Sequence, residues 1–476
     1  MQEIKLSKFA NFIKVGNSFC LYHSLLFNTI FINPAIYRAI KKDIRSFTIA
    51  YPKLFDILKT NKLLVLPEED QNVLNSLREI KNIPEYSLLR ILMTDVCNLS
   101  CKYCKVDRNI KNKLTADLKK EDLILALKQF QKVSNSDVKL VSITGGEPLV
   151  YFDKVKEIIE SCSKYLTNYW IILFTNATLM TPQLAKYFKK NSIGVVVSLD
   201  GPKSEHDIAR VDLAGKGSYD RVIKGFKILK KEGCNVGISC VVGKHNCDNL
   251  VNDIKFIINK LKPDSLGLNP LKYPSPKDKN FFLLTKPEEY AIKTYEIFEY
   301  IRKKGIFLEQ INRRLTPFVE KKFKFYECGG CSGKNINLDA RGNIGSCKSY
   351  LVMEKLCQHV SEPIRGSKYF NKLMKRSPIY TDSCISCSAI GICGGGCSYE
   401  AFVDKGDQFR YSNRTCKFSK TFLDLLLNDL YRLNKKSIDT SLTNNGYYYI
   451  TDEDRYKIYG NVKITPGTLK YSVGHS

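Results

Sequence analysis

Three cysteines lie close together in the stretch MTDVCNLSCKYC at 93–104, with the spacing C-x3-C-x2-C. A [4Fe-4S] cluster has four irons, and each iron needs a terminal ligand. Three neighbouring thiolates satisfy three irons and leave the fourth open to a small molecule that binds through oxygen and nitrogen. A zinc knuckle is the competing interpretation, but it needs a fourth Cys or His close by, and the sequence has none there. The spacing therefore predicts a reactive cluster at Cys97, Cys101 and Cys104.

This spacing, with the aromatic Tyr103 directly before the last cysteine, resembles that of the radical S-adenosylmethionine (SAM) superfamily. The resemblance implies that the open iron binds SAM and that one electron from the cluster releases a 5′-deoxyadenosyl radical. That radical abstracts a hydrogen atom from the substrate. Tyr103 is grouped with the cofactor-binding residues, and no catalytic residue is assigned beyond the cluster and SAM.

Gly145, Gly146 and Glu147 follow an apolar run at 138–143 that is typical of a strand. Two glycines after a strand allow a backbone to approach a neighbour closely. At this distance after the cysteines, the segment resembles the superfamily motif that binds the SAM amino group. Asn176, at the end of another expected strand, is also assigned to cofactor binding.

Ser198 and Asp200 lie two residues apart at the end of an expected strand, so their side chains point to the same side. The resemblance implies that they hold the SAM ribose and that Arg210 faces the SAM carboxylate. A solvated surface arginine is the alternative for Arg210. His206 is given no role.

Nine more cysteines lie within ninety residues near the C-terminal end, and eight of them, all but Cys357, form the pattern considered first. The chain opens without a long apolar export segment, so metal binding is favoured over disulfides. Two four-cysteine zinc sites are the alternative. The arrangement resembles the SPASM extension of radical SAM peptide-modifying enzymes, which implies two auxiliary [4Fe-4S] clusters. The first would be bound by Cys328, Cys331, Cys347 and Cys397, and the second by Cys384, Cys387, Cys393 and Cys416.

If Cys328 were not a ligand, the first auxiliary cluster would have an open iron that could bind a substrate thiolate. Cys162 and Cys240 stand in apolar surroundings and are predicted to be buried as small hydrophobic residues. Cys357 is a structural thiol or an alternative ligand. The cysteines left without a role are Cys20, Cys234 and Cys247.

Strand and helix patterns alternate over residues 88–304. Short continuous apolar runs are typical of parallel strands buried on both faces. The pattern predicts an α/β fold with a partial (β/α)6 TIM-like barrel, and all the motifs above follow strands, where such folds build their sites. Strands are expected at 88–94, 138–143, 169–175, 193–199, 235–242 and 264–269, and helices near 119–134, 152–166, 181–190, 218–232, 248–262 and 287–304.

Residues 1–87 predict a small α+β domain of winged-helix-like layout. Two apolar runs around Gly16-Asn17 indicate a hairpin, a third strand follows at 25–32, and Asn33-Pro34 opens a helix. Further helices are expected near 50–60 and 68–80. The layout resembles the leader-peptide recognition domains of peptide maturases, and a packing extension of the barrel is the alternative.

The C-terminal part of the chain divides in two. Residues 305–436 form the expected SPASM domain, beginning with a connector at 305–327 that carries Arg313-Arg314. The tail at 437–476 is polar and rich in tyrosine, and no role is assigned to it.

The formal net charge is +27, which would suit nucleic acid or a membrane surface. The lysines are spread along the chain, however, and no apolar run is long enough to span a membrane. We therefore expect a cytoplasmic protein without membrane attachment, for which an acidic peptide is a better partner than nucleic acid.

Together these features predict a maturase of a leader-bearing ribosomal peptide, with thioether formation (cysteine sulfur to carbon) as the reaction and a flavodoxin or ferredoxin as electron donor. Carbon–carbon cross-linking and epimerisation remain open. Sulfatase-maturing relatives oxidise Cys or Ser to formylglycine, and they carry an aspartate that acts as a general base directly after the third auxiliary ligand. This chain has Lys348 at that position, after Cys347. A nucleic-acid-modifying radical enzyme and a multi-cluster electron carrier are the other classes.

Overall fold

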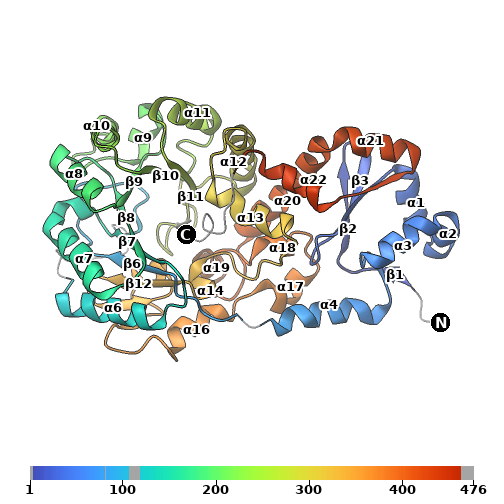
Figure 1. Ribbon diagram of the computed structural model, residues 1–476, viewed down its shortest axis with the longest axis horizontal. Coiled ribbons are helices and arrows are strands. Elements are labelled where there is room, and N and C mark those ends of the chain that lie inside the picture. The colour runs from blue at the N-terminus through green and yellow to red at the C-terminus, as the bar shows by residue number, and fades with distance from the viewer. Residues whose placement is uncertain (1–3, 81, 107–117, 463–476) are drawn as a thin grey trace.

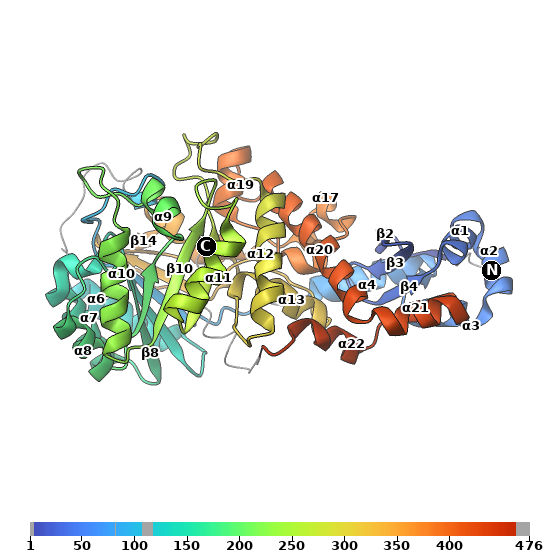
Figure 2. The same ribbon diagram turned by 90° about the horizontal axis from the view of Figure 1, so that it is seen from above.

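The computed structural model describes residues 4–80, 82–106 and 118–462. The molecule is elongated, with the barrel at one end, the cysteine-rich region in the middle and the N-terminal domain at the other end (Figure 1). The view from above shows the same order and places the N-terminal domain furthest from the barrel (Figure 2).

The barrel is built on six neighbouring parallel strands that run in sequence order across the sheet. Most of their apolar residues are buried, as expected for strands covered by helices on one side and filled by side chains on the other, although Trp170 in the third strand is exposed. The six predicted strands are confirmed as β6 (Leu88–Leu92), β7 (Lys139–Thr144), β8 (Tyr169–Thr175), β9 (Gly194–Ser198), β10 (Val236–Val242) and β11 (Ser265–Pro270).

Amphipathic helices cover the outside of this sheet (Figure 1). One short helix, α9 (Lys203–Ala209), was not predicted from the sequence. The six predicted helices are confirmed as α6 (Lys120–Val133), α7 (Phe152–Tyr165), α8 (Pro182–Lys190), α10 (Tyr219–Lys231), α11 (Leu250–Leu261) and α12 (Pro287–Arg302).

Three strands of the cysteine-rich region extend the barrel sheet beyond β6. β12 (Asn335–Asp339) pairs in parallel with β6, and β13 (Asn343–Gly345) and β14 (Gln358–His359) follow in antiparallel order. The alternating polar and apolar residues of β12 do not resemble a strand buried on both faces, although all five are buried. This pairing places the first auxiliary cysteine group beside the first barrel strand.

The expected connector at 305–327 contains a helix in its central part, α13 (Glu309–Val319), which carries buried Arg314. Its polar sequence hides the fact that it packs on β11 and on a short cysteine-bearing helix. The other helices of the cysteine-rich region are α14 (Gly329–Ser332), α15 (Lys348–Leu351), α16 (Lys368–Met374), η2 (Pro378–Tyr380), α17 (Asp382–Ile385), α18 (Ile390–Cys393), α19 (Ser398–Lys405) and α20 (Asn413–Leu433).

The predicted N-terminal hairpin, third strand and helices are confirmed. Asn33 caps the first helix by accepting a hydrogen bond from the backbone N–H of Ile36 at 2.9 Å. The elements are β1 (Lys5–Leu6), β2 (Ala10–Val15), β3 (Ser18–His23), β4 (Thr29–Ile32), α1 (Pro34–Lys42), α2 (Ile44–Ala50), α3 (Pro52–Thr60), β5 (Leu64–Val65) and α4 (Pro67–Glu79).

The tail folds back onto the N-terminal domain. It forms α21 (Lys435–Asn444), β15 (Tyr447–Tyr449), α22 (Asp452–Tyr456) and η3 (Lys457–Tyr459), and β15 pairs with the edge of β4. The buried Arg455 donates to Thr29 Oγ1 at 3.0 Å and to the carbonyl of Phe318 at 3.4 Å. The described tail therefore ties the N-terminal sheet to α13.

The N-terminal domain also packs against the second auxiliary cysteine group. Phe9, Leu25 and Leu74 share one hydrophobic cluster with Ile379 and Ile390, and the side chains of Cys384 and Cys387 border it. This contact makes the domain part of the wall around those cysteines.

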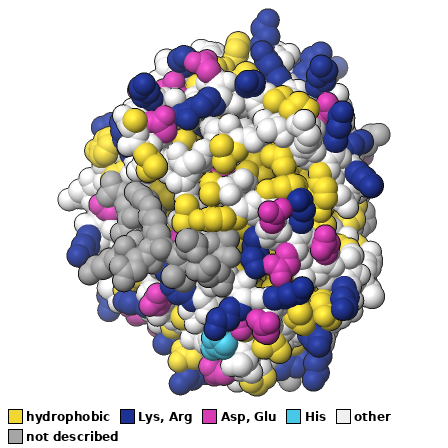
Figure 3. Space-filling view, turned by 90° about the vertical axis from the view of Figure 1, so that its left-hand side faces the viewer, with side chains coloured by type: hydrophobic (Ala, Val, Ile, Leu, Met, Phe, Trp, Pro, Cys, Tyr) yellow, Lys and Arg dark blue, Asp and Glu magenta, His cyan; other side chains and the backbone are white. Residues whose placement is uncertain are grey.

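No helix among the described residues is long and apolar enough to cross a membrane. On the barrel face shown in Figure 3, Lys and Arg side chains are scattered and interspersed with Asp and Glu. This distribution agrees with the even spread of lysines along the sequence.

Candidate active site

The three motif cysteines lie in the loop that follows β6. The loop is pinned to the end of α9, because the backbone N–H groups of Ser100 and Lys102 donate to the carbonyls of Val211 and Ala209, both at 2.9 Å. Cys97 and Cys104 are close enough to Cys101 to raise the pKa of its thiol, so the loop brings all three sulfurs together.

Burial raises the pKa of the Cys97 and Cys101 thiols to about 12. Both sulfurs therefore need a nearby cation to become thiolates, and the irons of a cluster are such cations. The Cys97 sulfur also accepts a hydrogen bond from the Leu99 N–H at 3.4 Å. These residues fit a cluster held by three thiolates.

Gly145 and Gly146 bring the end of β7 against the cysteine loop. A Cβ on Gly146 would lie 2.0 Å from the carbonyl oxygen of Val96, and one on Gly145 would lie 2.4 Å from that of Thr94. The Gly146 N–H donates to Thr94 at 2.6 Å, and the Glu147 N–H donates to Val96 at 2.8 Å. The glycine pair is thus required where two loop backbones touch, and Gly145 also lines the cavity described below.

The Glu147 carboxylate joins the ends of β7 and β8. It accepts hydrogen bonds from Thr175 Oγ1 at 2.6 Å, from the Asn176 N–H at 2.7 Å and from the Leu149 N–H at 3.0 Å. Burial raises the pKa of this carboxyl, although the three donors oppose the shift. The Asn176 side chain in turn donates to Asn98 Oδ1 in the cysteine loop at 2.9 Å.

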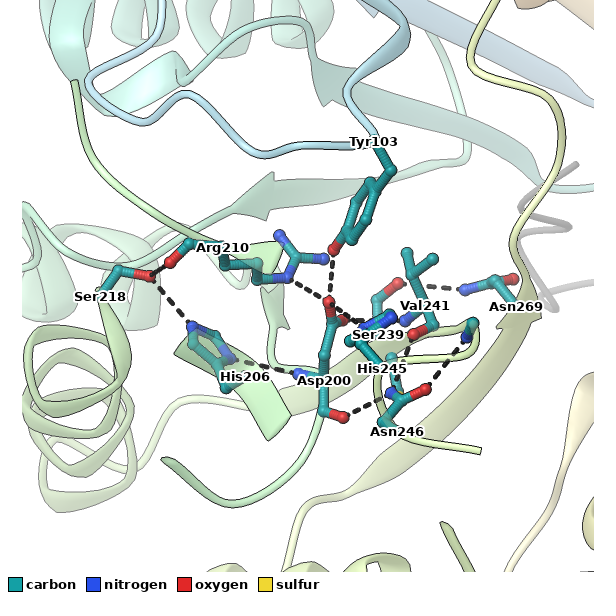
Figure 4. A network of polar contacts seen from close by, with 12 residues as sticks. Tyr103, Asp200, His206, Arg210, Ser218, Ser239, Val241, His245, Asn246 and Asn269 are labelled. Atoms are coloured by element: carbon teal, nitrogen blue, oxygen red, sulfur yellow. Dashed lines mark hydrogen bonds and ion pairs between the residues drawn. The ribbon is translucent and has the colours of Figure 1, made fainter. Parts of the chain in front are cut away.

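Asp200 and Arg210 form the centre of a buried polar network (Figure 4). Arg210 Nε lies 2.9 Å from Asp200 Oδ2, which also accepts a hydrogen bond from the Tyr103 hydroxyl. His245 Nε2 lies 3.4 Å from the same oxygen, and the Val241 N–H donates to the other carboxylate oxygen at 2.9 Å. Burial opposes the charged form of Asp200, but Arg210 and His245 outweigh burial and hold its pKa well below the ordinary range.

His206, to which the sequence assigned nothing, fixes the loop that carries Arg210. Its Nδ1 accepts from the Asp200 N–H at 3.3 Å, and its Nε2 lies 3.0 Å from Ser218 Oγ (Figure 4). Ser218 then donates to the Arg210 carbonyl at 2.8 Å. Burial lowers the pKa of His206 to about 4, so its ring is neutral near pH 7 and can accept a hydrogen bond.

A cavity of about 300 Å³ opens at the carboxyl ends of the barrel strands. Five predicted cofactor or cluster residues line it, whereas Gly146, Glu147, Asn176 and Asp200 lie outside its lining and hold the liners in place. The five are Tyr103, Cys104, Gly145, Ser198 and Arg210.

The other side of this cavity carries residues that the sequence did not assign to the site, although Lys348 was singled out there as the residue after Cys347. Ser239 and Asn269 are joined by a hydrogen bond of 3.1 Å. Lys105, Lys272 and Lys348 also line it. Lys105 and Lys348 directly follow cysteines, and Lys272 lies just after β11, so these positions could have indicated a site. In a lysine-rich chain, however, a single lysine at such a position is weak evidence.

These lysines crowd one another. Burial lowers the pKa of Lys105 to about 8, with Lys272 adding repulsion. Burial also lowers the pKa of Lys348 well below its ordinary value, and Arg90, Lys105 and Lys272 add to the effect. For Lys272, burial is outweighed by Cys397 and Glu400, which raise its pKa.

The structure brings together the four cysteines predicted for the first auxiliary cluster. Cys331 and Cys397 are buried in one cluster of side chains that Cys328 and Cys347 border. The Cys331 side chain lies within hydrogen-bonding reach of Cys328, which lowers the pKa of Cys328 well below its ordinary value. Cys328 is therefore placed with the other three.

The four cysteines predicted for the second auxiliary cluster surround a separate small cavity. It is closed by the α20 residue Thr415 and by Gly395, whose φ of +77° suits glycine. The cysteines in its wall are Cys384, Cys387, Cys393 and Cys416.

Among the described residues, no three His, Cys, Asp or Glu side chains converge as the ligands of a single metal ion do. The thiolates of a [4Fe-4S] cluster are spread over four irons and lie further apart than the ligands of one zinc ion.

Cys162 and Cys240 are fully buried, which confirms the prediction for them. Cys20, Cys234 and Cys247 are buried as well. Burial and two carboxylates raise the pKa of the Cys357 thiol, and the cysteines of the auxiliary groups do not contribute to this shift.

Comparison with known proteins identifies the family of this chain. The Radical SAM superfamily model matches residues 91–257, which span the cysteine loop and most of the barrel. The radical SAM cyclopropyl synthase TigE of Paramaledivibacter caminithermalis is 24% identical, over 92% of this chain and 99% of TigE. The serine-type anaerobic sulfatase-maturating enzyme of Bacteroides thetaiotaomicron is 31% identical, over 68% of this chain and 84% of that enzyme.

Solved structures show the same fold. Native anSMEcpe with bound AdoMet superposes with a TM-score of 0.62 at 19% identity, covering 74% of this chain and 98% of that one. Streptococcus suis SuiB superposes with a TM-score of 0.53 at 18% identity, covering 87% of this chain and 99% of SuiB. This chain belongs to the radical SAM superfamily of enzymes, in the family that includes the anaerobic sulfatase-maturating enzymes.

Proposed function

We propose that this radical SAM enzyme forms a new bond within a ribosomally made peptide by an oxidation that removes two hydrogen atoms. One observation carries the proposal: a single cavity is lined at one side by Cys104 and Arg210 and at the other by Lys348 and Ser349, which directly follow Cys347. A peptide residue in this cavity would lie between the radical source and an auxiliary cysteine group.

When bound, SAM and its cluster supply a 5′-deoxyadenosyl radical that removes a hydrogen atom from the substrate. The chain's own residues position these groups. Arg210 is held by Asp200 so that its guanidinium faces the cavity, and we assign it to the SAM carboxylate. Ser198, at the same rim, is assigned to the ribose.

We propose that each C-terminal cysteine group binds an auxiliary [4Fe-4S] cluster, and that the first provides a nearby one-electron acceptor. Cys328 is gathered with its three partners, which would give every iron of that cluster a thiolate. A fully ligated cluster has no free position for a substrate thiolate. This favours electron transfer over substrate binding at that group.

Thioether formation is the product expected from the sequence. Carbon–carbon ring closure is a second candidate, because the similarity to the cyclopropyl synthase TigE spans 99% of TigE. Formylglycine formation is disfavoured, since Lys348 lines the cavity at the position where the sequence resemblance implies a general-base aspartate in sulfatase-maturing enzymes.

The N-terminal domain is assigned to the leader peptide. Its sheet has the order β15-β4-β3-β2, so the chain's own tail covers the β4 edge and β2 forms the other edge. We place an extended leader along β2, as added strands bind at sheet edges. A flavodoxin or ferredoxin remains the proposed reductant.

The test is anaerobic co-expression with a candidate precursor peptide, followed by mass spectrometry. We expect 5′-deoxyadenosine and a peptide that has lost two hydrogen atoms for each bond. A thioether product would contain a cysteine that no longer reacts with an alkylating reagent, whereas a carbon–carbon product would form without cysteine. If no 5′-deoxyadenosine forms under reducing conditions, the assigned activity is wrong.

A further inference from the structure

Four basic side chains from separate segments meet on one side of the cavity. Arg90 comes from β6, Lys105 follows the cysteine loop, Lys272 follows β11, and Lys348 begins α15. With Arg210 they make five basic residues among the described lining residues, and this lining contains no Asp or Glu. Like charges held together in a partly buried site are unfavourable unless an anion joins them.

Three carboxylates act on these basic residues, and Glu309 raises the pKa of Arg90. Asp200 is paired with Arg210 at 2.9 Å. Glu400 raises the pKa of Lys105 and of Lys272, but it also forms an ion pair with Arg414 at 3.4 Å. Glu400 lies outside the lining of this cavity and lines the neighbouring one.

With a cluster bound, the first auxiliary cysteine group would supply further negative charge behind the wall. Thiolates at Cys397 and Cys328 raise the pKa of Lys272, and a thiolate at Cys347 raises that of Lys348. A cluster bound there would keep its thiolate charge in the wall. The side chains of Lys272 and Lys348 are half-buried and line the cavity, so they can meet a ligand from its open side.

We propose that Lys272 and Lys348 form a carboxylate subsite for the peptide substrate. The carboxylate belongs to an Asp or Glu side chain near the modified residue, or to the C-terminus of the peptide. This inference rests on the proposed function, because it assigns one part of the substrate to the same cavity.

Charge and hydrogen bonding both select a carboxylate at this subsite. Each lysine ammonium offers three donors, and hydrogen bonds between ionised groups are stronger than neutral ones. The isosteric amide of Asn or Gln would have no charge and would turn an N–H₂ group toward the ammonium groups. The subsite therefore discriminates Glu from Gln although the two side chains have the same shape.

The experiment uses the reconstituted holoenzyme with SAM and without reductant, so that no turnover occurs. Three peptides are compared by equilibrium dialysis: acetyl-Gly-Glu-Gly-amide, acetyl-Gly-Gln-Gly-amide, and acetyl-Gly-Gln-Gly with a free C-terminal carboxylate. We expect a carboxylate peptide to bind about tenfold or more tightly than the neutral peptide, as one charge-assisted contact provides. The tighter of the two carboxylate peptides identifies the source of the carboxylate.

The variants Lys272→Met and Lys348→Met should each reduce this preference, and the double variant should abolish it. Lys348→Arg keeps the charge and should retain most of the preference, whereas Lys216→Met, on an exposed turn, should leave it unchanged. Equal binding of the Glu and Gln peptides to the unmodified enzyme would overturn the proposal. So would Met variants that shift the reduction potential of an auxiliary cluster but keep the peptide preference, because the lysines would then only balance the cluster.

Iron content and peptide-independent formation of 5′-deoxyadenosine are measured on the same preparations. Loss of 5′-deoxyadenosine in the unmodified enzyme would count against the proposed function. A missing carboxylate preference with 5′-deoxyadenosine intact would count against the subsite alone.

Discussion

Arg210 is locked onto Asp200, with its Nε 2.9 Å from the carboxylate oxygen that also accepts the Tyr103 hydroxyl. Tyr103 belongs to the cysteine loop, Asp200 follows β9, and Arg210 follows α9. The ion pair therefore connects the cluster loop to the cavity wall on which we place the SAM carboxylate. It also explains why the Asp200 carboxylate stays ionised although it is fully buried.

Asp200→Asn should weaken SAM binding by about tenfold or more. Removing one partner of a buried ion pair leaves an uncompensated charge and costs about 3–5 kcal/mol. Without this partner, Arg210 should no longer be held in position to bind the SAM carboxylate. SAM affinity can be measured by equilibrium dialysis with the reconstituted enzyme. Asp220→Asn, which breaks an exposed pair with Lys203, is the matched control and should leave the affinity unchanged.

Gly146→Ala should prevent the cysteine loop from closing, because the new Cβ would lie 2.0 Å from a backbone oxygen of Val96. We expect loss of the SAM-binding cluster, with its iron and its visible absorbance, while the auxiliary clusters remain. Gly194→Ala meets only ordinary contacts, the nearest at 3.6 Å, and should retain full iron. Normal cluster content in Gly146→Ala would contradict the close packing described here.

Iron content should separate the three cysteine groups. The unmodified enzyme should hold about twelve irons per chain, four for each cluster. Cys101→Ala should lose about four irons together with all SAM cleavage, since two irons would lack a thiolate. Cys416→Ala should lower iron without removing the SAM-binding cluster, and Cys357→Ser should change nothing. About four irons in the unmodified enzyme would refute the auxiliary assignment.

Asp429→Ala should destabilise the packing of α12 on α20. Asp429 is bound by Arg302, whose Nη2 donates to Asp429 Oδ1 at 3.0 Å, and by the Tyr295 hydroxyl at 2.9 Å. Removing a carboxylate from a buried pair should cost about 3–5 kcal/mol in the free energy of unfolding. Asp153→Ala, in an exposed pair with Lys156, should cost less than about 1 kcal/mol. Anaerobic denaturant unfolding of the two variants checks the difference.

Asp253→Asn should stabilise the protein at neutral pH. Burial, with repulsion from Glu205, raises the pKa of Asp253 from 3.8 to about 6. The folded state therefore holds this proton more tightly, and stability falls as pH rises from about 4 to about 6. Above that window the variant should gain about 1 kcal/mol, a figure reduced for solvent screening. Melting temperatures at pH 5 and pH 8 test it; an equal gain at both would rule out this linkage.

The sequence alone predicted the barrel strands and helices, because a parallel sheet needs continuous apolar strands and each covering helix needs an apolar stripe. It also identified the three motif cysteines, since their spacing is local and one loop can hold them. The N-terminal hairpin and the cap at Asn33 were readable for the same reason: each depends on residues that are neighbours in the chain.

Tertiary structure decided what depends on residues distant in sequence. The polar tail and β12 carry no strong strand signal, yet β15 pairs with β4, and β12 pairs with β6 some 250 positions earlier, at a register in which Asn337 faces Arg90. Only the folded chain shows that His206 supports Arg210, and that Lys272 and Lys348 share one cavity. Local patterns specify secondary structure, whereas the charge and shape of a site depend on which strand ends the sheet brings together.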